Sequence, residues 1–411
     1  MNKLLLVACL LSVSIAHAQI DRPAEPPGPL TLIAALALAR AQNSELAAFG
    51  REVGAADASV LQSELLPNPE LNATWEEVGK PSRSTSLQIS QLIELGGKRS
   101  ARIRVAGLGK DAATAEFEAK RIDVLTRTAQ AFIDVLAGQR RKQLSDQAVA
   151  LAGQAADAVG KRVTAGKVSP VEETKARLEA GAARIEAEQA GRELTSARKR
   201  LSAFWGNSSP RFTEAAGDLE LLVVVPPFEQ LTQRARGNPE RTRAIAEVAR
   251  RSALLDGERA KRIPDITLGA GVKRAQENRE NLPLFTLTIP LPFFDRNQGN
   301  VLEAIRRVEK ARDEQAANES RLDSELGQTY ERLKAVEMEV KTLRDELLPG
   351  AKSAFDAATT GYQLGKFGFL DAIDAQRTLF QSNQQYVKAL AEFHRAVADI
   401  ERLTGEPLTA K

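Results

Sequence analysis

The sequence predicts a mainly α-helical chain with a minor β part, in which long antiparallel coiled-coil helices are combined with four β-strands. Three observations predict this class. Ala, Glu, Arg, Leu and Gln are abundant and aromatic residues make up only 5% of the chain, which is the composition of long helices. Apolar residues recur every three or four positions along most of the chain but alternate in four short segments. The same order of segments occurs twice, which indicates a duplicated chain.

The N-terminus has the pattern of a secretory signal peptide over residues 1–18. Lys3 precedes an almost unbroken apolar run, Leu4–Ile15, and Ala16-His17-Ala18 forms a small-residue cleavage site ahead of Gln19. This segment is too short and wrongly flanked to span a membrane. We therefore expect an exported protein from which residues 1–18 are removed.

A second processing pattern overlaps the first, because Leu6-Val7-Ala8-Cys9 fits the site at which lipoproteins are cut. Cleavage there would leave too short an apolar segment before the cut and an apolar tail after it, so we favour cleavage after Ala18. The sequence leaves open whether Cys9 is ever a lipidation site. The favoured cleavage removes the one cysteine, so no disulfide is expected.

The charges of the chain are balanced, with 57 Lys and Arg residues against 54 Asp and Glu residues, and they are dispersed rather than grouped. This pattern argues against a nucleic-acid-binding surface. After the signal peptide, no apolar stretch approaches the length of a transmembrane helix. Any membrane crossing would therefore be made by β-strands, whose signal is weaker in each segment.

Residues that usually bind metals are nearly missing from the mature sequence, which retains one histidine, His394, and one methionine, Met338. Such a chain cannot form a specific site for zinc, copper or cobalt. We interpret His394 as a packing or surface residue. No catalytic triad, phosphate-binding loop or pair of carboxylates around a cleft emerges either. We expect no catalytic, cofactor or metal site, and therefore no enzyme.

The two copies of the plan occupy residues 31–206 and 227–405. A linker at 207–226 joins them, a Pro-rich extension at 19–30 precedes them, and a tail at 406–411 follows. An offset of 199 aligns Leu92–Gly97 with Leu291–Arg296 and Gly166 with Gly365, and an offset of 195 aligns Asn43 with Asn238. The four-residue difference falls between the two strands of each copy, where a hairpin loop can absorb it.

Each copy opens with a helix that an asparagine caps, Asn43 or Asn238, and that ends at a proline after Leu66 or Ile263. Two strands follow, in which apolar and polar residues alternate over roughly nine or ten positions, about the length of a tilted strand that crosses a bilayer. The expected strands cover about 70–78 and 84–92 in the first copy, and about 265–275 and 284–292 in the second.

A very long helix follows each strand pair. In the first copy no proline occurs between Pro81 and Pro170, and a helix from about Lys98 to Lys161 would be about 95 Å long. Each long helix turns at a glycine and returns through a second helix with its own apolar stripe. The stripes alone indicate an ordinary coiled-coil core. A coiled coil does not explain two strand pairs with apolar faces.

Four strands cannot close a barrel, and an open sheet edge is not tolerated in lipid. The chain must therefore oligomerise, and two copies would give eight strands whereas three would give twelve. Small polar residues on the opposite face of the strands suit a water-filled lumen, which favours three copies.

Several sequence strings resemble the TolC-like outer-membrane factors of tripartite efflux systems. The family's periplasmic tip turn is matched by Tyr362–Gly365 with Leu370–Ala375, and more weakly by Arg162–Gly166. Leu66–Leu71 and Gln91–Arg99 resemble the heavy-metal subclass of the cobalt-zinc-cadmium type. The order of these strings, together with the duplication, extends the resemblance over essentially the whole mature chain.

The resemblance implies a homotrimer with a 12-strand β-barrel in the outer membrane and a 12-helix α-barrel in the periplasm. Its partners would be outer-membrane lipid, a periplasmic adaptor (a membrane fusion protein) and an inner-membrane pump of the resistance-nodulation-division (RND) class. The chain would be a passive exit duct for heavy-metal cations such as cobalt, zinc and cadmium. Alternatives are a duct for drugs or organic compounds, a periplasmic adaptor, or a structural coiled-coil protein. Adaptors carry one coiled-coil hairpin, whereas this sequence contains two.

The resemblance also assigns an entrance to the end of the helical region. Asp371 and Asp374, three residues apart on one helix face, would form an acidic ring that selects cations. The alternative is that both are first-turn acids that stabilise a helix N-terminus. Tyr362 and Glu172 match positions that hold the entrance closed, and Phe367 stands where an arginine completes that network in some relatives.

The turns themselves would be the contact for the adaptor. They contain Gly166 with Lys167 in the first copy and Gly365 with Lys366 in the second. The two glycines supply turn geometry and would also let the adaptor approach the backbone closely.

Overall fold

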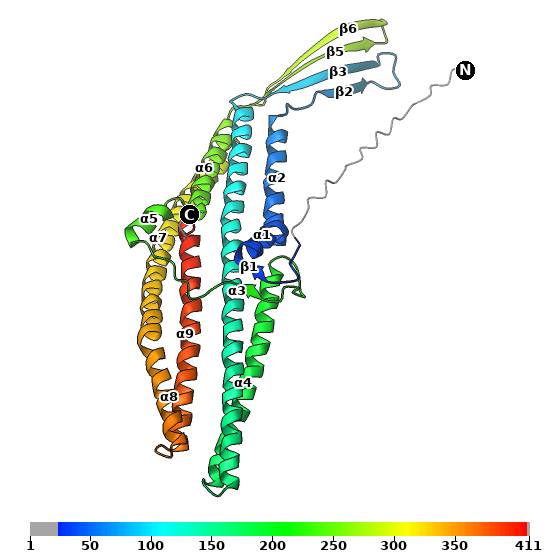
Figure 1. Ribbon diagram of the computed structural model, residues 1–411. Coiled ribbons are helices and arrows are strands. Elements are labelled where there is room, and N and C mark those ends of the chain that lie inside the picture. Colours follow the sequence, from blue (N-terminus) through cyan, green and yellow to red (C-terminus); the bar gives the residue numbers. More distant parts are fainter. Residues whose placement is uncertain (1–23, 409–411) are drawn as a thin grey trace, which may run out of the picture.

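The computed structural model describes residues 24–408 (Figure 1). The predicted signal peptide, part of the Pro-rich extension and the end of the predicted tail therefore lie outside the described residues. The described chain is mainly helical with few strands, which confirms the predicted class. Long helices run side by side along the molecule, and a four-stranded sheet extends from one end.

The elements of the two copies follow the same order. The first copy contains β1 (Leu30–Thr31), α1 (Leu32–Gln42), α2 (Ser44–Glu64), β2 (Glu70–Glu76), β3 (Ser84–Ile93), α3 (Lys98–Thr164) and α4 (Pro170–Ala203). Next come β4 (Ala215–Ala216), α5 (Phe228–Ala235), α6 (Pro239–Ala260), β5 (Ile266–Ala275), β6 (Glu280–Thr288), α7 (Gln298–Thr342), the π-helical turn η1 (Leu343–Leu347), α8 (Leu348–Gln363) and α9 (Phe369–Thr404). Within residues 24–408, no helix combines the length and the apolar character needed to cross a membrane.

The helices form a layer with two free edges. Near the sheet, α3 contacts α2 and α6, and α6 contacts α7; in the far half, α3 contacts α4 and α9, and α9 contacts α7 and α8. The lateral order is therefore α2-α3-α6-α7 near the sheet and α4-α3-α9 with α7 and α8 farther away (Figure 1). One edge consists of α2 and α4, and the other consists of α7 and α8.

The largest core lies where α3, α7 and α9 meet the segment between the two copies. Leu326, Leu333, Phe393 and Ile400 are fully buried there. His394 belongs to the same region, and its Nε2 lies 2.8 Å from the carbonyl oxygen of Leu219. Burial lowers the pKa of His394, although the Leu219 carbonyl opposes this effect. His394 is therefore a packing residue.

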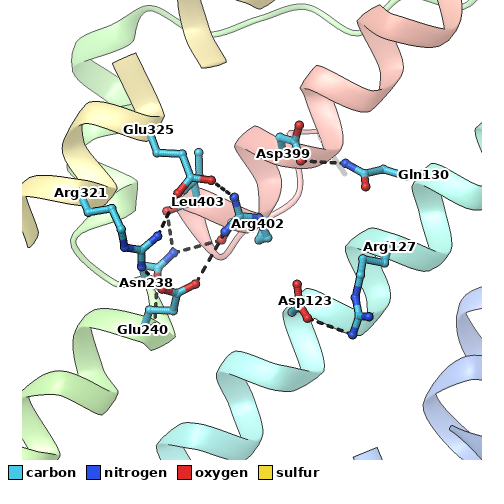
Figure 2. Close-up of polar contacts among 10 residues, drawn as sticks. All are labelled: Asp123, Arg127, Gln130, Asn238, Glu240, Arg321, Glu325, Asp399, Arg402 and Leu403. Carbon is cyan, nitrogen blue, oxygen red and sulfur yellow. Dashed lines mark hydrogen bonds and ion pairs between the residues drawn. The ribbon is translucent and has the colours of Figure 1, made fainter. Parts of the chain in front are cut away.

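Each copy is closed by an asparagine that serves two helices. The side-chain oxygens of Asn43 and Asn238 cap α2 and α6, as the sequence predicted. Their side-chain nitrogens donate to the last carbonyl groups of the returning helices, from Asn43 to Phe204 at 2.8 Å and from Asn238 to Leu403 at 2.9 Å (Figure 2). Equivalent residues thus make equivalent bonds, which supports the duplication.

The charged residues beside these asparagines are not equivalent. In the second copy Glu240 lies 2.5 Å from Arg321 of α7 and 3.7 Å from Arg402 of α9, so three helices are joined (Figure 2). In the first copy the matching acid, Glu45, lies 2.8 Å from Arg127 of α3. The backbone arrangement has been retained while the ion pairs have diverged.

The sheet has the antiparallel order β2-β3-β5-β6. Its pairing places one set of apolar side chains on a single face: Leu71, Ala73, Trp75, Leu87, Ile89, Leu268, Ala270, Val272, Phe285 and Leu287. These side chains are largely exposed, Trp75 by 65% and Phe285 by 80%. The other face carries mostly small or polar residues: Asn72, Thr74, Ser86, Gln88, Ser90, Thr267, Gly269, Gly271, Thr286 and Thr288. One face of the sheet is therefore suited to lipid and the other to water.

The pairing corrects the predicted alignment of the second strands. Ala73 pairs with Leu87, and Leu268, which is equivalent to Ala73, pairs with Leu287. The offset between the second strands is therefore 200 rather than 199, because an odd offset would exchange the two faces of the sheet. The left-handed residues before the long helices, Gly97 and Asn297, obey the same offset of 200. The missing residue thus lies within the long helices, whose tips return to an offset of 199.

Candidate functional site

The tip of each long hairpin is built around a glycine in the left-handed conformation. Gly166 has φ +67° and Gly365 has φ +72°. The next amide, of Lys167 or Lys366, donates to the carbonyl oxygen five residues earlier, at 2.9 Å and 2.8 Å. No atom lies within 4 Å of a Cβ built on either glycine, so the turn requires glycine for its φ angle and not for space. Both turns present exposed backbone and an exposed lysine.

The two hairpin tips pack against each other through a small apolar core. Val159 and Ala176 come from the first hairpin, and Phe369 and Ile373 come from the second. Tyr362 lies against this core, with its ring centroid 5.6 Å from that of Phe369. The structure thus places the predicted residue Tyr362 at the contact between the hairpins.

An arginine from the first hairpin covers Tyr362. The guanidinium carbon of Arg162 lies 4.6 Å from the centroid of the Tyr362 ring, and its Nη1 lies 3.5 Å from the Tyr362 carbonyl oxygen. This geometry is a cation–π contact between α3 and α8. The sequence contains Arg162 within a tip motif, but nothing local predicts the contact, since the two residues are 200 positions apart.

The contact between the hairpins is polar but incompletely paired. The Tyr362 hydroxyl and one Glu172 carboxylate oxygen are buried without a hydrogen-bond partner among the described residues. Burial raises the pKa of Tyr362, nearby Glu172 raises it further, and Arg162 opposes both effects. A buried polar atom without a partner costs about 1–3 kcal/mol. The tips are therefore joined by a contact that is not fully stabilised.

The two acidic residues of the predicted ring differ in their surroundings. Asp371 accepts a hydrogen bond from the Gly368 amide at 2.9 Å, which caps the N-terminus of α9. Asp374 is exposed one turn later and makes no hydrogen bond through its carboxylate within residues 24–408. The capping alternative thus describes the observed contact of Asp371, whereas the Asp374 carboxylate is available to solvent.

Two further contacts at this end were not expected from the sequence. Arg377 of α9 donates from Nε to Glu179 of α4 at 3.0 Å, so it joins the two hairpins above the tips. The Phe367 ring lies on the backbone of Gly361, where an added Cβ would collide with it. Phe367 therefore packs on its own hairpin, and the cation beside Tyr362 comes from the other one.

Metal-ligand geometry was sought over the same part of the chain. Between residues 24 and 408, no three or more His, Cys, Asp or Glu side chains are grouped so that they could hold a metal ion. The charged groups at the tips are instead distributed along helix surfaces.

Comparison with known sequences gives a match over both copies. The family described as "Outer membrane efflux protein" matches residues 35–207 and 232–406. The chain is 41% identical to the cobalt-zinc-cadmium resistance protein CzcC of Cupriavidus metallidurans, over 97% of this chain and 98% of that protein. It is 30% identical to the nickel and cobalt resistance protein CnrC of the same organism, over 77% of this chain and 72% of that protein.

Solved structures agree in fold. The structure of CusC, described in connection with transmembrane channel formation, superposes with a TM-score of 0.79 at 19% sequence identity. The superposition covers 91% of this chain and 92% of that one.

Proposed function

The chain belongs to the outer membrane efflux protein family, and from this premise we propose that it is the exit duct of a tripartite RND-type system for heavy-metal cations such as cobalt, zinc and cadmium. The family comprises channels rather than enzymes. The observation that carries the choice of cargo is the 41% identity to CzcC over almost the full length of both chains. The proposed duct consists of the two repeats at 31–206 and 227–405.

The proposed assembly is a homotrimer with twelve strands and twelve helical columns. Its support is that the sheet and the helical layer have matching free edges, with β2 above α2 and α4 on one side and β6 above α7 and α8 on the other. The α4 edge carries Val171, Leu178 and Ile185 at a spacing of seven residues, and these side chains are 60–71% exposed. Such a stripe fits the edge of a neighbouring copy.

The proposed location is the outer membrane, with the helices in the periplasm and residues 1–18 removed. The apolar face of the sheet would contact lipid, and the polar face would line the water-filled passage. The long helices would then form the periplasmic tunnel, whose narrow end is at the hairpin tips.

At the proposed entrance, three copies would gather six carboxylates from Asp371 and Asp374, whose field favours cations. Tyr362 and Glu172 would hold the entrance closed, and Arg162 would take part in the same contact. Opening would separate the hairpins at a place where buried polar atoms lack partners.

The exposed turns at Gly166, Lys167, Gly365 and Lys366 are the proposed contact for the periplasmic adaptor, which connects the duct to the inner-membrane RND pump. Because the duct offers no cluster of metal ligands within residues 24–408, selection among metals is assigned to the pump.

The test is complementation in cells that lack their own metal-efflux duct but retain the adaptor and pump. Expression of this chain should restore growth on cobalt, zinc and cadmium and lower the metal content of the cells. A matched variant with Leu287→Arg should fail, because it impairs membrane insertion. Restored tolerance to organic compounds without any change in metal content would contradict the proposed cargo.

A further inference from the structure

The free edge of β6 can be read from one proline. Pro283 pairs with Val272, but proline has no amide hydrogen, so this pair cannot exchange hydrogen bonds with β5. The carbonyl of Pro283 must therefore point to the free edge. Because the direction alternates along a strand, the amides of Phe285 and Leu287 also point to the free edge, where no strand of the same chain lies.

The alternating pattern continues beyond the last paired residue. Ile289 and Leu291 extend the apolar positions of β6 and are 47% and 67% exposed. The prolines between and after them, Pro290 and Pro292, have the other parity, so their missing amide hydrogens fall on the side of β5. The strand β5 begins only at Ile266, opposite Ile289, so these prolines interrupt no pairing there. The free edge thus keeps its donors after Thr288.

The duplication supplies the register of a strand that could pair with this edge. Within one chain, β3 pairs with β5, and Gln88 lies opposite Gly271. The counterpart of β3 is β6, at an offset of 200, and the counterpart of β5 is β2, at an offset of 195. Applying these offsets places Thr288 opposite Glu76.

We infer that β6 of one copy pairs with β2 of a second copy in this register, with Thr288 opposite Glu76, Ile289 opposite Trp75 and Pro290 opposite Thr74. The inference rests on the proposed trimeric channel and specifies how its sheet closes. The register keeps Ile289 and Trp75 together on the apolar face. A slip of one residue would place Glu76 opposite Ile289 and expose its carboxylate to lipid.

Cysteine cross-linking tests the register, because the mature sequence has no cysteine. Thr288→Cys with Glu76→Cys should form a disulfide between copies in membranes under mild oxidation, visible as a covalent ladder in denaturing gels. The two strands of one chain cannot cross-link, since they lie at opposite edges of the sheet, about 14 Å apart. The matched control is Thr288→Cys with Thr74→Cys, on the same face but two positions out of register, which should yield at least about tenfold less product.

A second pair guards against loss of the Glu76 side chain, which lies 2.6 Å from Lys273. Pro290→Cys with Thr74→Cys probes the same register without changing Glu76, and it should also cross-link. Preferential linkage of Thr288→Cys with Thr74→Cys would overturn the register. A conducting trimer that none of the pairs cross-links would overturn the inference and leave the channel intact, whereas a non-conducting monomer would overturn both.

Discussion

Leu287→Arg tests the assignment of the lipid-facing side of the sheet. Leu287 lies on the apolar face, opposite Leu268, and two residues from Phe285, which pairs with Ala270 near the middle of β5. Two residues correspond to about 7 Å along the strand, and to about 5 Å in depth for a strand tilted by about 45°. The arginine would therefore lie near the centre of the bilayer, although not at it.

An arginine at the bilayer midplane of a β-barrel costs about 2–4 kcal/mol, and the cost falls towards the interfaces. We expect about 2 kcal/mol for each copy of Leu287→Arg, hence about 6 kcal/mol for a trimer. The assay is unfolding by denaturant in lipid vesicles, together with the yield of protein inserted in membranes. Both the free energy of unfolding and the yield should fall.

The matched control is Leu284→Arg on the same strand. Leu284 pairs with Gly271 on the polar face, so the same substitution would place its charge in water. We expect a change within about 0.5 kcal/mol. Equal effects of the two substitutions, or a larger effect at Leu284, would refute the assignment of the two faces.

Three further predictions concern the entrance and the N-terminal segment. Arg162→Gln should raise the pKa of Tyr362 further, as measured by ultraviolet titration of a variant whose other two tyrosines are phenylalanine; an unchanged pKa would exclude the cation–π contact. Asp371→Ala should lower thermal stability by about 1 kcal/mol by loss of the cap, whereas Asp374→Ala should mainly reduce cation preference in bilayer conductance, and less so at high salt; identical behaviour of the two variants would contradict their separate roles. Burial alone would raise the pKa of Glu25, but hydrogen bonds from Trp205, Asn207 and two backbone amides lower it, so its stabilisation is present above the pKa of the unfolded chain and is lost as the pH falls through the lower pKa of the folded state. Glu25→Gln should reduce the loss of stability in acid followed by tryptophan fluorescence, and an unchanged acid transition would count against this.

The sequence by itself determined the features that depend on local periodicity. Alternation over roughly ten residues identified the strands and their apolar faces, because side chains of a strand point alternately to its two sides. Asn43 and Asn238 identified the starts of α2 and α6, since a cap needs only residues within one turn. The glycines of the tips identified the turns for the same reason.

Only the tertiary structure decided which distant residues meet. Arg162 and Tyr362 lie 200 positions apart on different hairpins, and no local pattern encodes their contact. The capping bond of Asp371 and the free carboxylate of Asp374 could not be distinguished by their spacing, because both residues share a helix face. The offset of 200 in the second strands needed the pairing of Leu268 with Leu287, since similar letters align almost equally well one position away. Periodicity specifies which face of an element is buried, but the partner of that face is set by the packing of the whole chain.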